Sequence, residues 1–84
     1  MTEGTVAEIL GLTDKQIQQF SDAYDQGIDH IKYGASKVDV VCRLWAEKIP
    51  IHLNLVFMRD EENGNPTLIR FKKLSEEEYK SSLK

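Results

Sequence analysis

Three aspartates, Asp22, Asp25 and Asp29, stand three and four residues apart in a stretch whose apolar residues recur with a helical period. On a helix this spacing places the three carboxylates in one stripe on one face. Such a stripe suits docking on a basic surface of a partner protein, or holding Mg²⁺ through bound waters, and it also occurs on ordinary solvated helices. Because metal sites usually recruit ligands from more than one element, we expect a partner-binding surface and no metal site.

The other residues that could take part in catalysis or bind a ligand are scattered. His30 and His52 stand in no metal-binding spacing, and the single cysteine, Cys42, lies between Val41 and Arg43 in an apolar segment. We expect the histidines at the surface or its boundary, and the thiol as a small buried hydrophobe. The 84 residues contain no phosphate-binding loop, nucleophile elbow or dinucleotide-binding glycine pattern. The sequence therefore predicts neither an enzyme nor a cofactor.

The aspartate stripe is carried by a predicted long helix. Thr13 begins this helix as the first residue of a capping box that Gln16 closes, and Gly34 marks its end. The apolar face of the helix comprises Ile17, Phe20, Tyr24, Ile28 and Ile31. Gly27, in the helix interior, costs up to about 1 kcal/mol relative to alanine. We interpret it as a site of close packing.

A shorter helix precedes the long one. Thr5 and Glu8 have the form of another capping box, and the helix stops at Gly11, where a left-handed backbone conformation costs little. Residues 6–20 resemble the helix-turn-helix of bacterial transcription factors. The resemblance rests on a small residue, a turn glycine, an apolar residue after it and an isoleucine, at Ala7, Gly11, Leu12 and Ile17. It implies that the residues approaching the edges of DNA bases are Lys15, Gln16, Gln18 and Gln19.

Residues 37–49 match two templates about equally well. As a strand, the segment alternates, with one side made by Val38, Val40, Cys42 and Leu44. As a helix, it presents an apolar stripe that runs from Val38 to Ile49. The β-branched run at Val38, Val40 and Val41 favours the strand.

Two clearer strands follow. Ile51–Met58 begins after Pro50, which breaks any helix, and its apolar residues alternate. Residues 60–66 are rich in turn formers, and Thr67–Lys73 then returns as a strand with Ile69 and Phe71 on its inner face. These features predict an antiparallel hairpin.

Ser75 caps a short last helix, and three glutamates face the positive end of that helix. The sequence thus predicts an α+β fold in which an N-terminal helical pair, short then long, packs on a small two- or three-stranded antiparallel meander before a short C-terminal helix. We expect the helices on one face of the sheet, and the large apolar groups to be supplied by Tyr33 and Trp45 together with the strand at residues 51–57. Residues 1–84 form a single compact domain in this prediction.

The net charge of −3 conceals an uneven distribution along the chain. Residues 1–34 carry two lysines against six carboxylates, a balance of −4, whereas residues 35–73 carry seven lysines and arginines against five carboxylates, a balance of +2. The tail, residues 74–84, contributes −1. A globally basic nucleic-acid binder is excluded, and the acidic helices would repel phosphates.

These observations favour a small non-enzymatic protein that binds another protein as a regulator or inhibitor through its charged surface. The alternative is a nucleic-acid-binding transcription regulator that uses the helix-turn-helix-like segment at residues 5–20. Acidic helices beside a mildly basic sheet, and the edges that a small sheet leaves open, suit self-association. We therefore expect a homodimer.

The chain shows no signal for export or membrane insertion. Met1–Gly4 carries no basic segment and no apolar stretch follows, as a secretory signal would require. The longest apolar run, Leu55–Met58, is far short of the roughly 18–20 residues that span a bilayer. A lone thiol fits a reducing compartment. We therefore expect a cytoplasmic protein without membrane contact.

Overall fold

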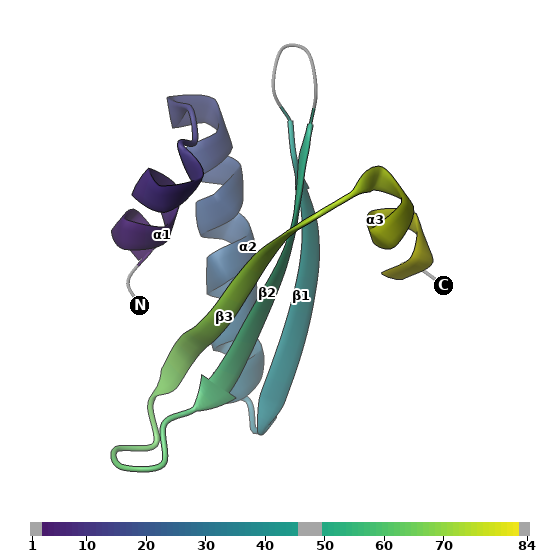
Figure 1. Ribbon diagram of the computed structural model, residues 1–84. Coiled ribbons are helices and arrows are strands. Elements are labelled where there is room, and N and C mark those ends of the chain that lie inside the picture. The colour runs from purple at the N-terminus through teal and green to yellow at the C-terminus, as the bar shows by residue number, and fades with distance from the viewer. Residues whose placement is uncertain (1–2, 46–49, 83–84) are drawn as a thin grey trace.

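The computed structural model describes residues 3–45 and 50–82, in which helices lie on both sides of one antiparallel sheet (Figure 1). The elements follow one another as α1 (Glu3–Leu10), α2 (Asp14–Lys32), β1 (Lys37–Leu44), β2 (Ile51–Arg59), β3 (Pro66–Leu74) and α3 (Glu76–Ser82). The strands lie in the order β1-β2-β3, and both neighbouring pairs are antiparallel. The predicted α+β fold is confirmed, with three strands in the meander.

The ends of the first two helices follow local sequence signals, with one exception. At the start of α2, the Thr13 hydroxyl accepts from the backbone N–H of Gln16 at 3.3 Å, and the Gln16 carboxamide accepts from the Thr13 N–H at 3.1 Å. Gly11 follows α1 with φ of +65°, in the left-handed region that glycine adopts at little cost. The predicted cap at Thr5 is wrong, because α1 begins earlier, at Glu3.

Residues 37–44 form a strand, as their β-branched residues favour. Every residue of β1 has a partner in β2, in a register that sets Lys37 opposite Met58 and Leu44 opposite Ile51. The local periodicity of this segment also fits a helix. The segment forms a strand because β2 supplies backbone hydrogen-bond partners along its whole length. The part of the helical alternative that covers residues 46–49 lies outside the described residues.

The core lies between α2 and the inner face of the sheet, with α1 closing one side. Its largest fully buried side chains include Phe20 and Ile31 of α2 together with Leu53, Leu55 and Phe57 of β2. At Gly27, α2 passes close to β2. A Cβ built on Gly27 would lie 2.8 Å from Cζ of Phe57 and nearer still to two other carbons of that ring. The predicted close packing at this glycine is confirmed.

Arg59, the last residue of β2, fastens the sheet to the end of α2. Its guanidinium donates to the carbonyl of Ile31, in the last turn of the helix, which also accepts from the Gly34 N–H at 3.1 Å. Nη1 of Arg59 donates to the carbonyl of Gly64 at 2.9 Å. One side chain therefore holds the C-terminal end of α2 and the loop between β2 and β3.

Two large aromatic side chains lie at the surface, and the predicted inner-face position of Ile69 is wrong. Tyr33 and Trp45 are 91% and 54% exposed, because each lies just beyond the end of an element that packs on the core. Ile69 is 46% exposed. A bulge in β3 pairs Arg70 with Val56 and Leu68 with Phe57, which leaves Ile69 as the extra residue and turns it out of the inner face.

α3 lies on the opposite face of the sheet from α1 and α2 (Figure 1). Its Tyr79 ring stacks on His52, whereas the neighbouring β2 residue Leu53 belongs to the core on the other face. The expectation that all helices share one face is therefore wrong for α3. The short stretch after β3 allows the chain to cross to either side, and the aromatic contact with His52 decides which.

Candidate functional site

The predicted partner-binding residues Asp22, Asp25 and Asp29 are all exposed. They lie on the side of α2 opposite the residues that pack on the sheet, since Ala23, Gly27 and Ile31 are buried. Among residues 3–45 and 50–82, no cation lies within ion-pair distance of these carboxylates. Within the described residues, the stripe is therefore an exposed acidic face without a cation partner.

The acidic field extends beyond the stripe. Burial raises the pKa of the Tyr24 hydroxyl, and the charges of Glu3 and Asp25 raise it further. Glu3 of α1 therefore adds a carboxylate near the same helix. Within the described part of the chain, no group of three histidine, cysteine, aspartate or glutamate side chains is placed to hold a metal ion.

The structure separates the four residues of the helix-turn-helix-like segment that were expected to contact bases. Lys15 and Gln18 are exposed, but Gln16 is only 2% exposed and closes the capping box of α2. The Gln19 carboxamide accepts from the backbone N–H of Trp45 at 2.7 Å and donates to its carbonyl at 3.3 Å. The side chains of Gln16 and Gln19 are therefore both hydrogen-bonded within the fold.

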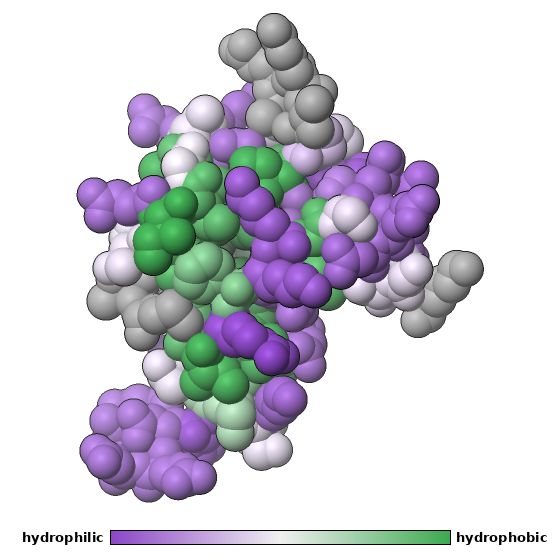
Figure 2. Space-filling view, viewed as in Figure 1, coloured by the Kyte–Doolittle hydropathy of each residue, from purple (hydrophilic) through white to green (hydrophobic). Residues whose placement is uncertain are grey.

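The corner between α1 and α2 leaves apolar groups at the surface. Ile9 and Ile17 are exposed, and Ile17 borders a shallow hollow of about 450 Å³. The hollow is lined by Gly4, Ala7, Glu8, Gly11, Leu12 and Ile17. Figure 2 shows hydrophobic surface over the region of α1, interrupted by hydrophilic side chains.

The outer face of the sheet holds α3 through a cluster of rings and one arginine. The rings of His52 and Tyr79 are stacked with centroids 4.4 Å apart, and Nε of Arg43 donates to Nε2 of His52 at 3.0 Å. The Arg43 guanidinium also lies 4.9 Å from the Tyr79 ring and 5.1 Å from the Trp45 ring. His52 lies on the outer face, as its position in the strand predicts, but it is only 7% exposed because Tyr79 covers it.

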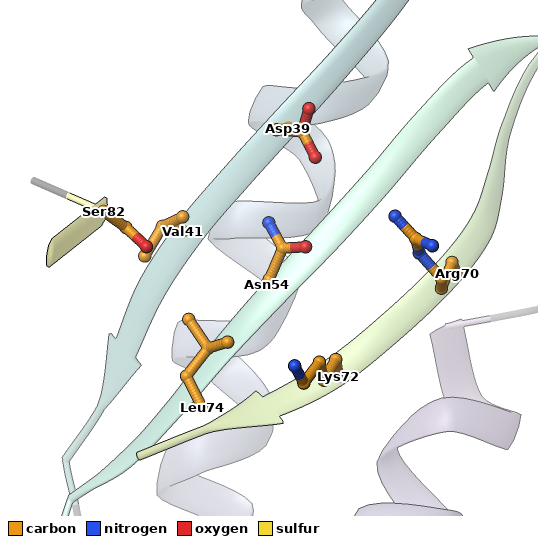
Figure 3. Close-up of a pocket in the computed structure, with 7 residues that line it drawn as sticks. All are labelled: Asp39, Val41, Asn54, Arg70, Lys72, Leu74 and Ser82. Carbon is orange, nitrogen blue, oxygen red and sulfur yellow. The ribbon is translucent and has the colours of Figure 1, made fainter. Parts of the chain in front are cut away.

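Beside α3, the outer face is open as a groove of about 540 Å³ (Figure 3). Its lining residues come from all three strands and the end of α3, and they are Asp39, Val41, Asn54, Arg70, Lys72, Leu74 and Ser82. Figure 3 shows Arg70 and Lys72 on β3 beside Asn54 of the middle strand. No sequence motif marks this site, because its residues converge only when the strands pair.

Two groups, Glu78 of α3 on the outer face and Cys42 of β1 on the inner face, have shifted pKa values. The backbone N–H of Ser75 and then the Lys72 ammonium, 3.2 Å away, lower the pKa of Glu78. Burial raises the pKa of the Cys42 thiol to about 11. The thiol is therefore protonated at neutral pH, in agreement with the expectation of a packed rather than a reactive cysteine.

Among the described residues, no helix is long and apolar enough to cross a membrane. Comparisons with protein-family models, with curated proteins and with solved structures found no match. The proposals below therefore rest on the surfaces of the chain itself.

Proposed function

We propose that the chain is a small non-enzymatic protein-binding domain that regulates or inhibits a protein with a basic surface. The observation that carries the proposal is the acidic face of α2, where Asp22, Asp25 and Asp29 are exposed and pair with no cation in the described part of the chain. The outer two aspartates are seven positions apart in the helix, which is about 10 Å along the axis. Such a face attracts a basic partner before contact and orients it.

A protein partner suits this surface better than nucleic acid does. The exposed face of α2 presents carboxylates that repel phosphates. Two of the four side chains that the helix-turn-helix resemblance assigns to base contacts, Gln16 and Gln19, are already bonded within the fold. The nucleic-acid alternative would depend on Lys15 and Gln18 alone.

Neutralising the stripe tests the proposal. Asp22→Asn, Asp25→Asn and Asp29→Asn together remove three charges from α2. The matched control, Glu61→Gln, Glu62→Gln and Glu77→Gln, removes three charges from other exposed positions. Immobilised wild-type protein and both variants are used to capture proteins from an extract of the native cells, and the captured proteins are quantified by mass spectrometry.

We expect the wild-type chain and the control variant to capture a basic protein that the aspartate variant does not capture. Salt at about 0.5 M should release this protein. Equal capture by the two variants would exclude the stripe as the binding surface. Capture of nucleic acid, with loss after Lys15→Gln, would favour the alternative.

We further propose that the chain acts as a homodimer, joined through the free edge of β1. The other edge strand, β3, is interrupted by the bulge at Ile69 and carries exposed Arg70, Lys72 and Lys73, which discourage pairing. β1 pairs with β2 without interruption and has no such bulge. Light scattering on a size-exclusion column should give twice the chain mass of 9.6 kDa. A constant monomer mass across a concentration series would exclude the dimer.

A further inference from the structure

The groove on the outer face is formed by two rows of side chains that α3 leaves uncovered. In one row Val41, Asn54 and Lys72 are cross-strand partners, and in the next Val56 separates Asp39 from Arg70. Val56 is almost fully buried at the bottom of its row. A partly apolar floor excludes water and so strengthens a charge pair formed above it.

The β3 side of the groove is basic, and one of its two cations already binds a carboxylate. Lys72 donates to Glu78 of α3 at 3.2 Å. Arg70 is exposed and makes no ion pair with any residue in the part of the chain that the structure describes. Its planar guanidinium is suited to a two-pronged contact with a carboxylate. Asp39, on the β1 side, repels a carboxylate and so confines an acidic ligand to the β3 side.

The spacing of the two cations indicates what fits them. Arg70 and Lys72 are two residues apart on one strand and point to the same face, which separates them by about 6.6 Å. Two carboxylates four residues apart on a helix are separated by about 6 Å. Asn54, on the middle strand, has a carboxamide that can donate to the same ligand.

We propose that this groove binds an acidic helix of a partner protein, with Arg70 and Lys72 holding carboxylates one helical turn apart, and that Glu78 of α3 competes for Lys72 in the free chain. This site is distinct from the acidic face of α2, which lies on the other side of the sheet. The chain therefore offers an acidic face to a basic partner and a basic groove to an acidic one.

The test measures fluorescence anisotropy of a labelled alanine-rich peptide about 16 residues long, enough to form a helix, with glutamate at every fourth position. A second peptide has glutamine in place of each glutamate. The variants are Arg70→Gln, Lys72→Gln and Glu78→Gln. Lys73→Gln is the matched control, because Lys73 is an exposed cation on β3 that pairs with Leu53 on the opposite face. Circular dichroism confirms that each variant is folded.

We expect the glutamate peptide to bind and the glutamine peptide not to bind. Arg70→Gln and Lys72→Gln should each weaken binding about two- to fivefold, and Lys73→Gln should leave it within about twofold. Glu78→Gln should strengthen binding about twofold or more, because it frees Lys72 while glutamine can still accept from the Ser75 N–H.

Several results would overturn the proposal. These are no binding of the glutamate peptide, equal binding of both peptides, or equal weakening by Lys73→Gln and Arg70→Gln. If Glu78→Gln bound the glutamate peptide with unchanged affinity, the proposed competition between Glu78 and the peptide for Lys72 would be refuted. Tighter binding of a single-stranded oligonucleotide with the same dependence on Arg70 and Lys72 would make the groove a nucleic-acid surface and reject an acidic protein as its ligand.

Discussion

Replacing Gly27 by alanine tests the packing that joins α2 to the sheet. Helix propensity alone predicts that the substitution stabilises the chain by about 1 kcal/mol. The new Cβ, however, would lie 2.8 Å from Cζ of Phe57, where carbon atoms prefer about 3.5–4.0 Å. The ring cannot turn away freely, because it is fully buried and meets the Tyr24 ring edge-on at 5.3 Å.

The magnitude follows from these opposing effects. Overpacking a core typically costs about 1–3 kcal/mol, and an overlap this large with a fixed ring belongs at the upper end. After the gain in propensity is subtracted, Gly27→Ala should lower the free energy of unfolding by about 2 kcal/mol. Urea denaturation followed by circular dichroism measures this change as a lower midpoint.

Gly4→Ala is the matched control. Gly4 also lies within a helix, α1, but a Cβ built there meets nothing within 4 Å. This substitution should leave stability unchanged or raise it by up to about 1 kcal/mol. In addition, Phe57→Leu should make room for the new methyl group, so that the double variant with Gly27→Ala loses about 1–2 kcal/mol less than the two single losses together. If Gly27→Ala stabilised the chain as Gly4→Ala does, the close packing would be refuted.

Four further predictions concern three side chains. Gln19→Ala should lower the free energy of unfolding, measured by thermal denaturation, by about 1 kcal/mol, because it removes both side-chain hydrogen bonds to the Trp45 backbone. The control Gln18→Ala should change it by no more than about 0.5 kcal/mol, and equal losses would contradict this role of Gln19. With its pKa raised from 9.0 to about 11, Cys42 should react with iodoacetamide at pH 8 about a hundredfold more slowly than in the urea-unfolded chain, as followed by mass spectrometry. Below pH 9 the thiol is neutral in both the folded and the unfolded chain. Between pH 9 and 11 the unfolded chain loses the proton first, so stability falls over that range. Cys42→Ala should flatten this fall, and an unchanged slope would count against it. Because its pKa is lowered, ionised Glu78 stabilises the docked α3 above pH 4.5, and this contribution is lost as the pH falls from 4.5 through the lowered pKa. NMR signals of Tyr79 should therefore shift on acidification in the wild-type chain and shift less in Glu78→Gln.

Features that depend on a few neighbouring residues could be predicted from the sequence. The capping box at Thr13 and Gln16 and the turn at Gly11 need only local hydrogen bonds and a left-handed glycine, and both are confirmed. The exposed acidic face of α2 follows from helical periodicity in the same way.

Features that depend on distant residues could not be predicted. Gln19 bonds to Trp45, which is 26 residues away, and nothing near either residue indicates the contact. The bulge that exposes Ile69 reflects the fit of β3 to β2. The groove required that α3 dock on the outer face, which rests on the stacking of Tyr79 on His52.

The attachment of α2 to the sheet has a consequence for the entropy of binding. Gln19 ties the first half of the helix to the backbone after β1, Arg59 ties its last turn to the end of β2, and Phe57 packs against Gly27 between them. These contacts at three points along the helix oppose sliding along the sheet and rotation about the helix axis. A partner that docks on α2 meets a preorganised surface, so little of the interaction energy is spent on ordering the backbone.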